Sequence, residues 1–184
     1  GTDLHTTTFD PSVAMKLSGI ARKYGSLIKG HYSDNVTNPE AYPASGMGAA
    51  NVGPEFTEKE YDALLELEDL QRSLYEEGKI ARPARMKSQL WDSVIESGRW
   101  KKWLQAGEDP DNFYSAGPQR QEWLIKTGCR YIWENPEVVA VRSHLYRNIG
   151  IQGIDASAIV ESSVEGAMDR YFYSFNLTGL NKLL

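Results

Sequence analysis

Apolar residues recur at helical spacing in six segments of this chain, and capping residues, prolines and glycines mark the ends of these segments. The clearest start is Asn135-Pro136-Glu137, where an N-cap residue precedes a proline and an acid at the positive helix end. Thr57 and Glu60 form a capping box ahead of a leucine-rich stretch, and Gly30 and Gly150 are expected helix stops. We therefore expect helices that begin near residues 10, 57, 83, 118, 135 and 155.

Gly128 lies on the apolar side of the helix that is expected to begin at Pro118. A glycine inside a helix costs about 1 kcal/mol of helix propensity relative to alanine. Because it has no side chain, it also lets a second helix approach closely. Gly128 therefore permits, without requiring, a close helix approach at this position.

No segment shows sustained apolar–polar alternation between hairpin turns, so the sequence predicts no strand. The predicted fold class is all-α, an irregular bundle of about five to six helices in a single domain over residues 1–184. Cys129 is the only cysteine, which excludes an intrachain disulfide and a disulfide-stapled secreted scaffold. The apolar runs fall far short of the roughly 20 residues that a membrane-spanning helix needs, and no secretory signal is visible. The cysteine usage is of the cytoplasmic type, and the cellular location is left open.

Two segments do not fit a compact helical bundle. Residues 31–56 are rich in proline and glycine and lack an apolar period, so we expect an extended arm or linker there. Residues 173–184 form an apolar C-terminal tail, which we expect to dock on a core or on a neighbour. The candidate interface residues in and beside these segments are Tyr42, Pro43, Met47, Phe172, Tyr173, Phe175, Leu180, Leu183 and Leu184.

Sequence motifs for enzyme or metal chemistry are absent. The chain has no P-loop, no H-E-x-x-H, no G-x-S-x-G and no C-x-x-C motif. The glycine-rich stretch Gly46-Met47-Gly48 follows no predicted strand, which a nucleotide-binding loop requires. The three histidines, His5, His31 and His144, lie in three different segments. We therefore predict no catalytic, cofactor-binding or metal-binding residue.

Charge is distributed unevenly along the chain. Residues 55–77 hold nine acids and two bases, whereas residues 79–102 hold seven bases and two acids. Blocks of opposite charge pair within one domain, or they form complementary faces between subunits. The second arrangement predicts a protein partner or copies of the chain itself.

The basic block also contains aromatic residues. A groove that binds single-stranded nucleic acid needs cations for the phosphates and aromatic rings for the bases. The residues that would form such a groove are Arg99, Trp100, Lys101, Lys102, Trp103 and Arg120. The pI near 5.3 opposes this interpretation, because an acidic protein is repelled by polyanions.

Three hypotheses of function follow. The leading one is a non-catalytic helical subunit that self-assembles or serves as an accessory subunit of a larger complex, because tryptophan and tyrosine are frequent and concentrate in interfaces. The second is a nucleocapsid-type or coat subunit that binds single-stranded nucleic acid. The third is an enzyme whose site combines Glu66 and Asp69 with His144 or Tyr146.

Overall fold

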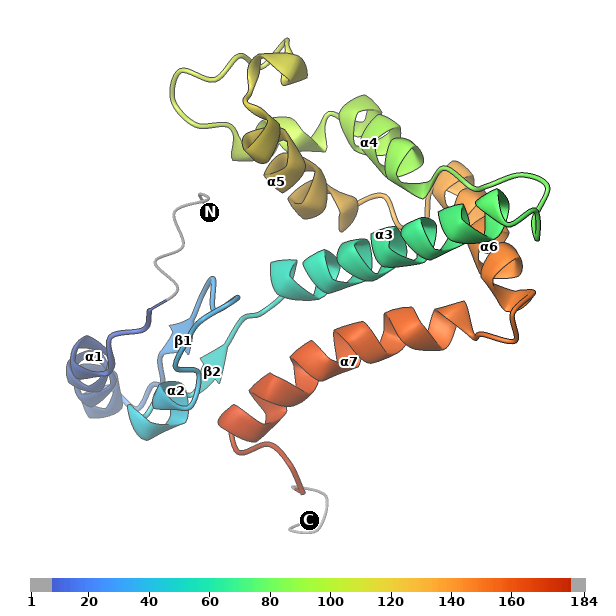
Figure 1. The fold of residues 1–184 in the computed structure, drawn as a ribbon. Helices are drawn as coiled ribbons and strands as arrows, with labels where there is room; N and C mark the ends of the chain where they lie inside the picture. The colour runs from blue at the N-terminus through green and yellow to red at the C-terminus, as the bar shows by residue number, and fades with distance from the viewer. Residues whose placement is uncertain (1–7, 180–184) are drawn as a thin grey trace. The chain divides into compact units, whose positions relative to one another are not determined.

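The computed structural model describes residues 8–179, and its regular structure is almost entirely helical (Figure 1). Across residues 8–179, helices make up 62% of the chain, with seven α-helices and almost no strand. The prediction of an all-α protein is therefore confirmed. Within the described range, no helix is long and apolar enough to cross a bilayer.

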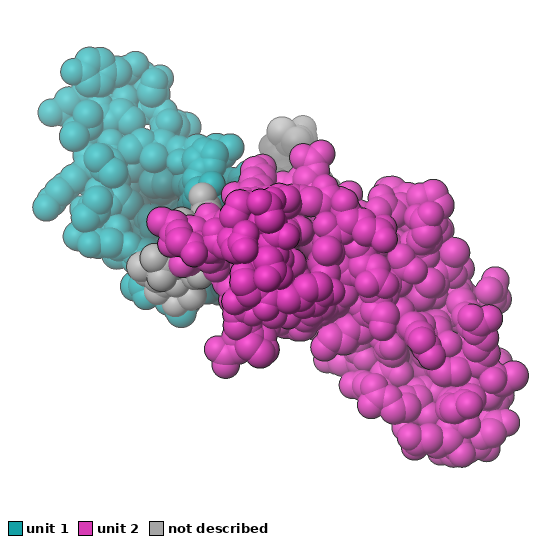
Figure 2. All heavy atoms as spheres, turned by 90° about the horizontal axis from the view of Figure 1, so that it is seen from above, with its two compact units in different colours: residues 1–56, 165–184 teal, residues 57–164 magenta. Residues whose placement is uncertain are grey.

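The chain divides into two compact units, which Figure 2 shows in different colours. Unit 1 combines the chain up to Phe56 with the chain from Glu165 onward, and unit 2 spans Thr57–Val164. One boundary falls near the start of helix α3 and the other lies within helix α7. Unit 1 is thus built from two segments that are remote in sequence, whereas unit 2 is continuous. The prediction of a single domain stays a prediction.

Unit 1 contains one regular helix, a short helix and a pair of short strands. Its elements are α1 (Pro11–Lys23), β1 (Lys29–Gly30), α2 (Ala41–Ala44), β2 (Ala49–Ala50), the first residues of α3 and the second half of α7. Asp10 caps α1, and its carboxylate accepts hydrogen bonds from the Ser12 and Val13 amides at 2.9 and 3.2 Å. The helix ends at Lys23, ahead of the predicted stop at Gly30, because Gly25 adopts a left-handed conformation with φ of 68°.

β1 and β2 pair in parallel, with Lys29 opposite Ala49 and Gly30 opposite Ala50. The sequence predicted no strand because two-residue strands are too short to show alternation. Residues 31–56, the predicted arm or linker, contain α2 and β2, and Val36 and Tyr42 within them are buried. These two residues pack with Tyr171 in the core of unit 1.

Unit 2 is a helical assembly with a larger core. Its elements are α3 (Pro54–Glu76), α4 (Met86–Ser97), the 3-10 helices η1 (Arg99–Trp103) and η2 (Phe113–Ser115), α5 (Pro118–Cys129), α6 (Pro136–Gly150) and the first half of α7 (Ala156–Ser174). Helix α4 packs against η1, α5 and α6. Its inner side chains Leu90 and Val94 are completely buried, as are Leu124 on α5 and Leu145 on α6.

Helices α4 and α5 approach closely at Gly128. A β-carbon added to Gly128 would lie 2.5 Å from Cγ1 of Val94, well inside van der Waals contact. The absence of a side chain at Gly128 is therefore what lets the two helices come this close.

Candidate active site at the carboxyl edge of the strand pair

The carboxyl ends of β1 and β2 lie at the same edge because the strands are parallel. Residues 31–35 follow β1, and residues 51–53 connect β2 to helix α3. The Ser33 amide donates a hydrogen bond to the Asn51 carbonyl at 3.1 Å, which joins these two connections. The side chains of His31 and Asn51 are exposed here. Open parallel sheets and parallel barrels bind their ligands at this edge, so we define residues 31–35 and 51–53 as the candidate site.

Asp34 is a buried member of the candidate site, and its carboxylate links the two connections. Its side chain is 3% exposed, and Oδ1 accepts hydrogen bonds from the amides of Gly53 at 2.8 Å and Glu55 at 3.0 Å. Glu55 is the second residue of α3, so Asp34 caps this helix from a remote position in the sequence. Within residues 8–179, Oδ2 of Asp34 is buried without a hydrogen-bond partner. The Asp34 carboxylate therefore fixes the connection after β2 relative to the connection after β1.

Glu55 ties the candidate site to helix α7. This carboxylate is 3% exposed and accepts hydrogen bonds from the Asn35 amide at 2.6 Å, from Arg170 Nη1 at 3.1 Å and from the Tyr171 hydroxyl. Arg170 also donates to the Val36 carbonyl. Burial and the adjacent Glu55 carboxylate raise the pKa of Tyr171, so its phenol keeps the proton that it donates. The loop after β1 is thus held by an ion pair and several hydrogen bonds.

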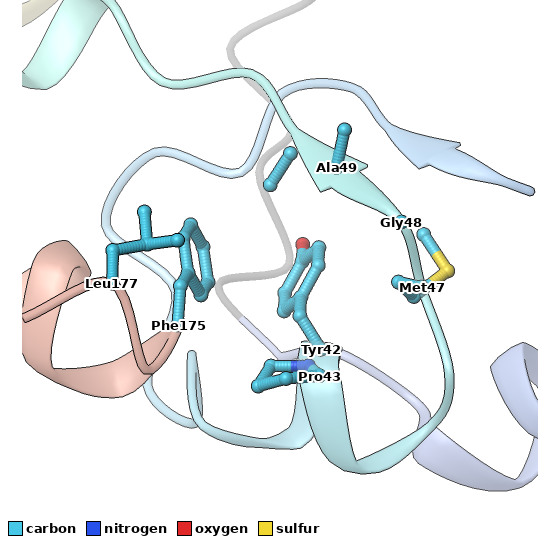
Figure 3. Close-up of a pocket in the computed structure, with 8 residues that line it drawn as sticks. Tyr42, Pro43, Met47, Gly48, Ala49, Phe175 and Leu177 are labelled. Atoms are coloured by element: carbon cyan, nitrogen blue, oxygen red, sulfur yellow. The ribbon is translucent and has the colours of Figure 1, made fainter. Parts of the chain in front are cut away.

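An apolar cavity of about 300 Å³ borders β2 (Figure 3). Figure 3 shows the rings of Tyr42 and Phe175 on facing sides of this cavity, and their centroids are 5.7 Å apart. Of the predicted interface residues, Tyr42, Pro43, Met47 and Phe175 line it together. Phe172 and Tyr173 are exposed on α7, at 46% and 69%. Leu180, Leu183 and Leu184 lie outside the described residues.

The predicted nucleic-acid groove is partly buried. Trp100 is 3% exposed and packs its ring edge-to-face with Phe113, so its indole faces the core. Arg99, Lys102 and Arg120 lie near Tyr131 or Trp103, and the ring centroids of these two residues are 5.7 Å apart. Arg120 donates to the Trp103 carbonyl at 2.6 Å and pairs with Glu108 at 2.7 Å.

The remaining groove residues are cations near aromatic rings. Arg99 and Lys102 lie 5.4 and 5.8 Å from the centre of the Tyr131 ring. Lys101 approaches Asp111 at 3.7 Å. Three cations and one indole are therefore close together, but the second indole is not available for stacking.

The residues of the predicted enzyme site have separate surroundings. Asp69 is exposed and pairs with Arg72 at 2.7 Å, and Glu66 is exposed on the same helix. Burial raises the pKa of Tyr146. His144 lines a different cavity on helix α6. Within the part of the chain that the structure describes, no group of three or more potential metal ligands is present.

Sequence reasoning did not single out Asp34, Glu55 or Arg170. The Glu55–Arg170 and Glu55–Tyr171 contacts join residues that are 115 and 116 positions apart, and no local motif connects them. One signal was available. Three consecutive polar residues, Ser33, Asp34 and Asn35, stand in a segment without an apolar period, where a folded chain must satisfy each buried backbone group.

No protein-family model matches the chain, and no curated protein sequence matches it significantly. One solved structure with a similar fold is the crystal structure of a probable tagatose 6 phosphate kinase from Sinorhizobium meliloti 1021. The TM-score is 0.65 and the sequence identity is 17%, and the match covers 91% of this chain and 48% of that one. The chain therefore spans about half the length of this protein, and the likeness shows a shared fold.

This likeness corrects the leading hypothesis. The chain was predicted to be a non-catalytic structural subunit that self-assembles, and a fold shared with a probable kinase contradicts that prediction. The physical reason lies in unit 1. The aromatic residues that suggested docking on a neighbour, such as Tyr42 and Phe175, pack with Tyr171 in the core of their own unit. The packed aromatic residues Tyr42 and Phe175 are therefore no sign of assembly here.

Proposed function

We propose that this chain forms part of an enzyme that binds a phosphorylated sugar at the carboxyl edge of β1 and β2. The observation that carries the proposal is the parallel strand pair, whose carboxyl ends bring the exposed His31 and Asn51 to one edge ahead of helix α3. The fold likeness to a probable tagatose 6 phosphate kinase supports a sugar phosphate as the class of ligand.

The two exposed side chains have different roles in this proposal. Asn51 supplies an amide that donates and accepts hydrogen bonds, which suits sugar hydroxyl groups. His31 supplies an imidazole, which transfers a proton to or from a bound hydroxyl group as a general acid or base. Asp34 and Glu55 act as positioning residues, because their carboxylates hold the backbone of both connections. A site whose backbone is fixed in advance loses less entropy when the ligand binds.

The test is a titration of the chain with tagatose 6-phosphate, followed by the amide chemical shifts of residues 30–35 and 49–53. We expect saturable shifts in these residues, and weaker binding of unphosphorylated tagatose. The variants His31→Gln and Asn51→Ala should each weaken binding about tenfold, which is the effect of one lost hydrogen bond of roughly 1.4 kcal/mol. The matched control is Gln152→Ala, which removes an exposed side-chain amide from unit 2.

Shifts that avoid both segments, or equal affinity for the unphosphorylated sugar, would contradict the proposal. The reaction is tested separately, by ADP formation from ATP with tagatose 6-phosphate as the acceptor. Formation above a control without the sugar, lost in His31→Gln, would assign phosphoryl transfer to this site.

A further inference from the structure

A second cavity, of about 350 Å³, lies in unit 2. Its lining contains basic side chains, whereas the cavity beside β2 is apolar. It is bordered by the loop before α4 and by α6, and its lining includes two arginines, Arg82 and Arg85, and one histidine, His144. The other lining residues are Pro83, Ala84 and Val141, so none of the acidic residues between positions 8 and 179 lines this cavity.

A buried polar network holds the loop that carries the two arginines. Gln71 is 1% exposed; its side-chain amide donates to the Ala84 carbonyl at 3.0 Å and accepts from the Ala84 amide at 2.8 Å. Asn148 on α6 donates to Gln71 Oε1 at 2.5 Å and to the Arg82 carbonyl at 3.0 Å. Buried amides that satisfy each other in this way make a loop rigid. The backbone at Arg82 and Ala84 therefore keeps a fixed position beside His144.

The two arginines of this cavity have no acidic partner among the described residues. Within residues 8–179, neither Arg82 nor Arg85 forms an ion pair, whereas Arg142 on the bordering helix α6 contacts an acid. Arg85 is also the N-cap residue of the 12-residue helix α4 and makes no side-chain capping bond. A cation at a helix N-terminus has the unfavourable sign for the helix dipole. In the first turn of α4, the Lys87 amide donates a hydrogen bond to the Glu68 carboxylate at 2.7 Å. Glu68 lines a separate groove that shares Arg85 with this cavity.

We infer that this cavity binds a small phosphate monoester, with Arg82 and Arg85 on the phosphate oxygens and His144 as a further donor. A guanidinium group matches a phosphate by two parallel hydrogen bonds, and two guanidinium groups balance its double negative charge. The volume lies at the lower end of the roughly 300–1,000 Å³ of small-molecule sites, so the organic part of the ester is small. This inference concerns unit 2 and does not depend on the site in unit 1.

The test uses glycerol 3-phosphate as the probe and isothermal titration calorimetry with the full chain, at matched ionic strength. Amide shifts of residues 82–87 and 141–148 locate the binding. We expect Arg82→Gln and Arg85→Gln to weaken binding at least tenfold each, because each removes a charged hydrogen-bond donor. The control is Arg130→Gln, which removes the same charge from an exposed residue outside the cavity. Inorganic phosphate and malonate serve as comparison ligands.

Several results would overturn the inference. The first is that glycerol 3-phosphate does not bind at millimolar concentration. The second is that Arg130→Gln weakens its binding as much as Arg82→Gln and Arg85→Gln do. The third is that malonate, a dicarboxylate of similar charge, binds with the same affinity. Loss of binding in His31→Gln with full binding in Arg82→Gln would also overturn it, because the ester would then occupy the site in unit 1. Conversely, tagatose 6-phosphate that fails to shift residues 30–35, together with arginine-dependent binding of glycerol 3-phosphate, would refute only the proposed function.

Discussion

Gly128 offers a stringent test of how α4 and α5 pack. The substitution Gly128→Ala places a β-carbon 2.5 Å from Cγ1 of Val94, which is completely buried. A β-branched valine has little rotamer freedom, so the helices must move apart. Overpacking of a core costs about 1–3 kcal/mol, and alanine returns about 1 kcal/mol of helix propensity. Because the overlap is severe, we expect a net loss of about 1–2 kcal/mol in the free energy of unfolding.

The assay is urea unfolding at 25 °C, followed by far-UV circular dichroism. Gly166→Ala is the control, because Gly166 is exposed inside α7 and an added β-carbon meets nothing within 4 Å. This control should be neutral or gain up to about 1 kcal/mol. The double variant Val94→Ala/Gly128→Ala isolates the clash, since Gly128→Ala should cost nothing once the valine methyl groups are removed.

Two results would refute this reasoning. The first is a Gly128→Ala variant that is as stable as the original chain. The second is an equal cost of Gly128→Ala with valine or alanine at position 94, because the loss would then have no connection with the Val94 contact.

Three further predictions concern other buried groups. Gly30→Ala should destabilise unit 1 by about 1–3 kcal/mol in urea unfolding, because its β-carbon would lie 2.7 Å from Cε1 of Tyr42; an unchanged midpoint would contradict the packing at β1. Glu108→Gln should cost about 1–2 kcal/mol at pH 7, because it weakens the charged hydrogen bonds to the largely buried Arg120. These bonds lower the pKa of Glu108 below its usual 4.5. The difference in the free energy of unfolding between the original chain and the variant should therefore be full above pH 4.5 and vanish as the pH falls through the lowered pKa. A difference that persists at pH 2.5 would refute this. Burial, with the nearby Glu60 and Glu122 carboxylates, raises the pKa of Cys129. Iodoacetamide at pH 8 should therefore alkylate this thiol at least 100-fold more slowly in the folded chain than in urea. Mass spectrometry measures the two rates.

The sequence predicted helices well where local signals decide their ends. The start signal Asn135-Pro136-Glu137 places α6 correctly at Pro136, and the predicted end at Gly150 is also correct. Predicted helix starts are wrong by a few residues where a contact with a residue remote in the sequence fixes the helix end. Helix α3 begins at Pro54, ahead of Thr57, because Asp34 caps it across 21 positions.

The loop at residues 82–85 shows the opposite error. A helix was expected to begin near Pro83, and α4 begins at Met86. The Gln71 and Asn148 side chains bind the backbone of Arg82 and Ala84 and hold it outside the helix. Such a tertiary network overrides a local helix signal.

The candidate site was mostly hidden from sequence reasoning for the same physical cause. His31 was noted as one of three scattered histidines, but its closeness to Asn51 depends on a parallel strand pair of only two residues per strand. The positioning contacts of Glu55 reach Arg170 and Tyr171 on the last helix. Residue type and spacing cannot reveal a contact between segments more than a hundred positions apart.

The division of unit 1 into two remote segments has a consequence for the order of folding during synthesis. All of unit 2 emerges from the ribosome as one continuous segment and can form its core at once. Glu55 is made early but receives Arg170 and Tyr171 only after the whole of unit 2 has been translated. Until then the Glu55 carboxylate lacks its hydrogen-bond donors on α7, and the aromatic side chains around Tyr42 lack Tyr171 and Phe175. The nascent chain therefore carries an incomplete unit 1, exposed to chaperones and proteases, while all of unit 2 is translated.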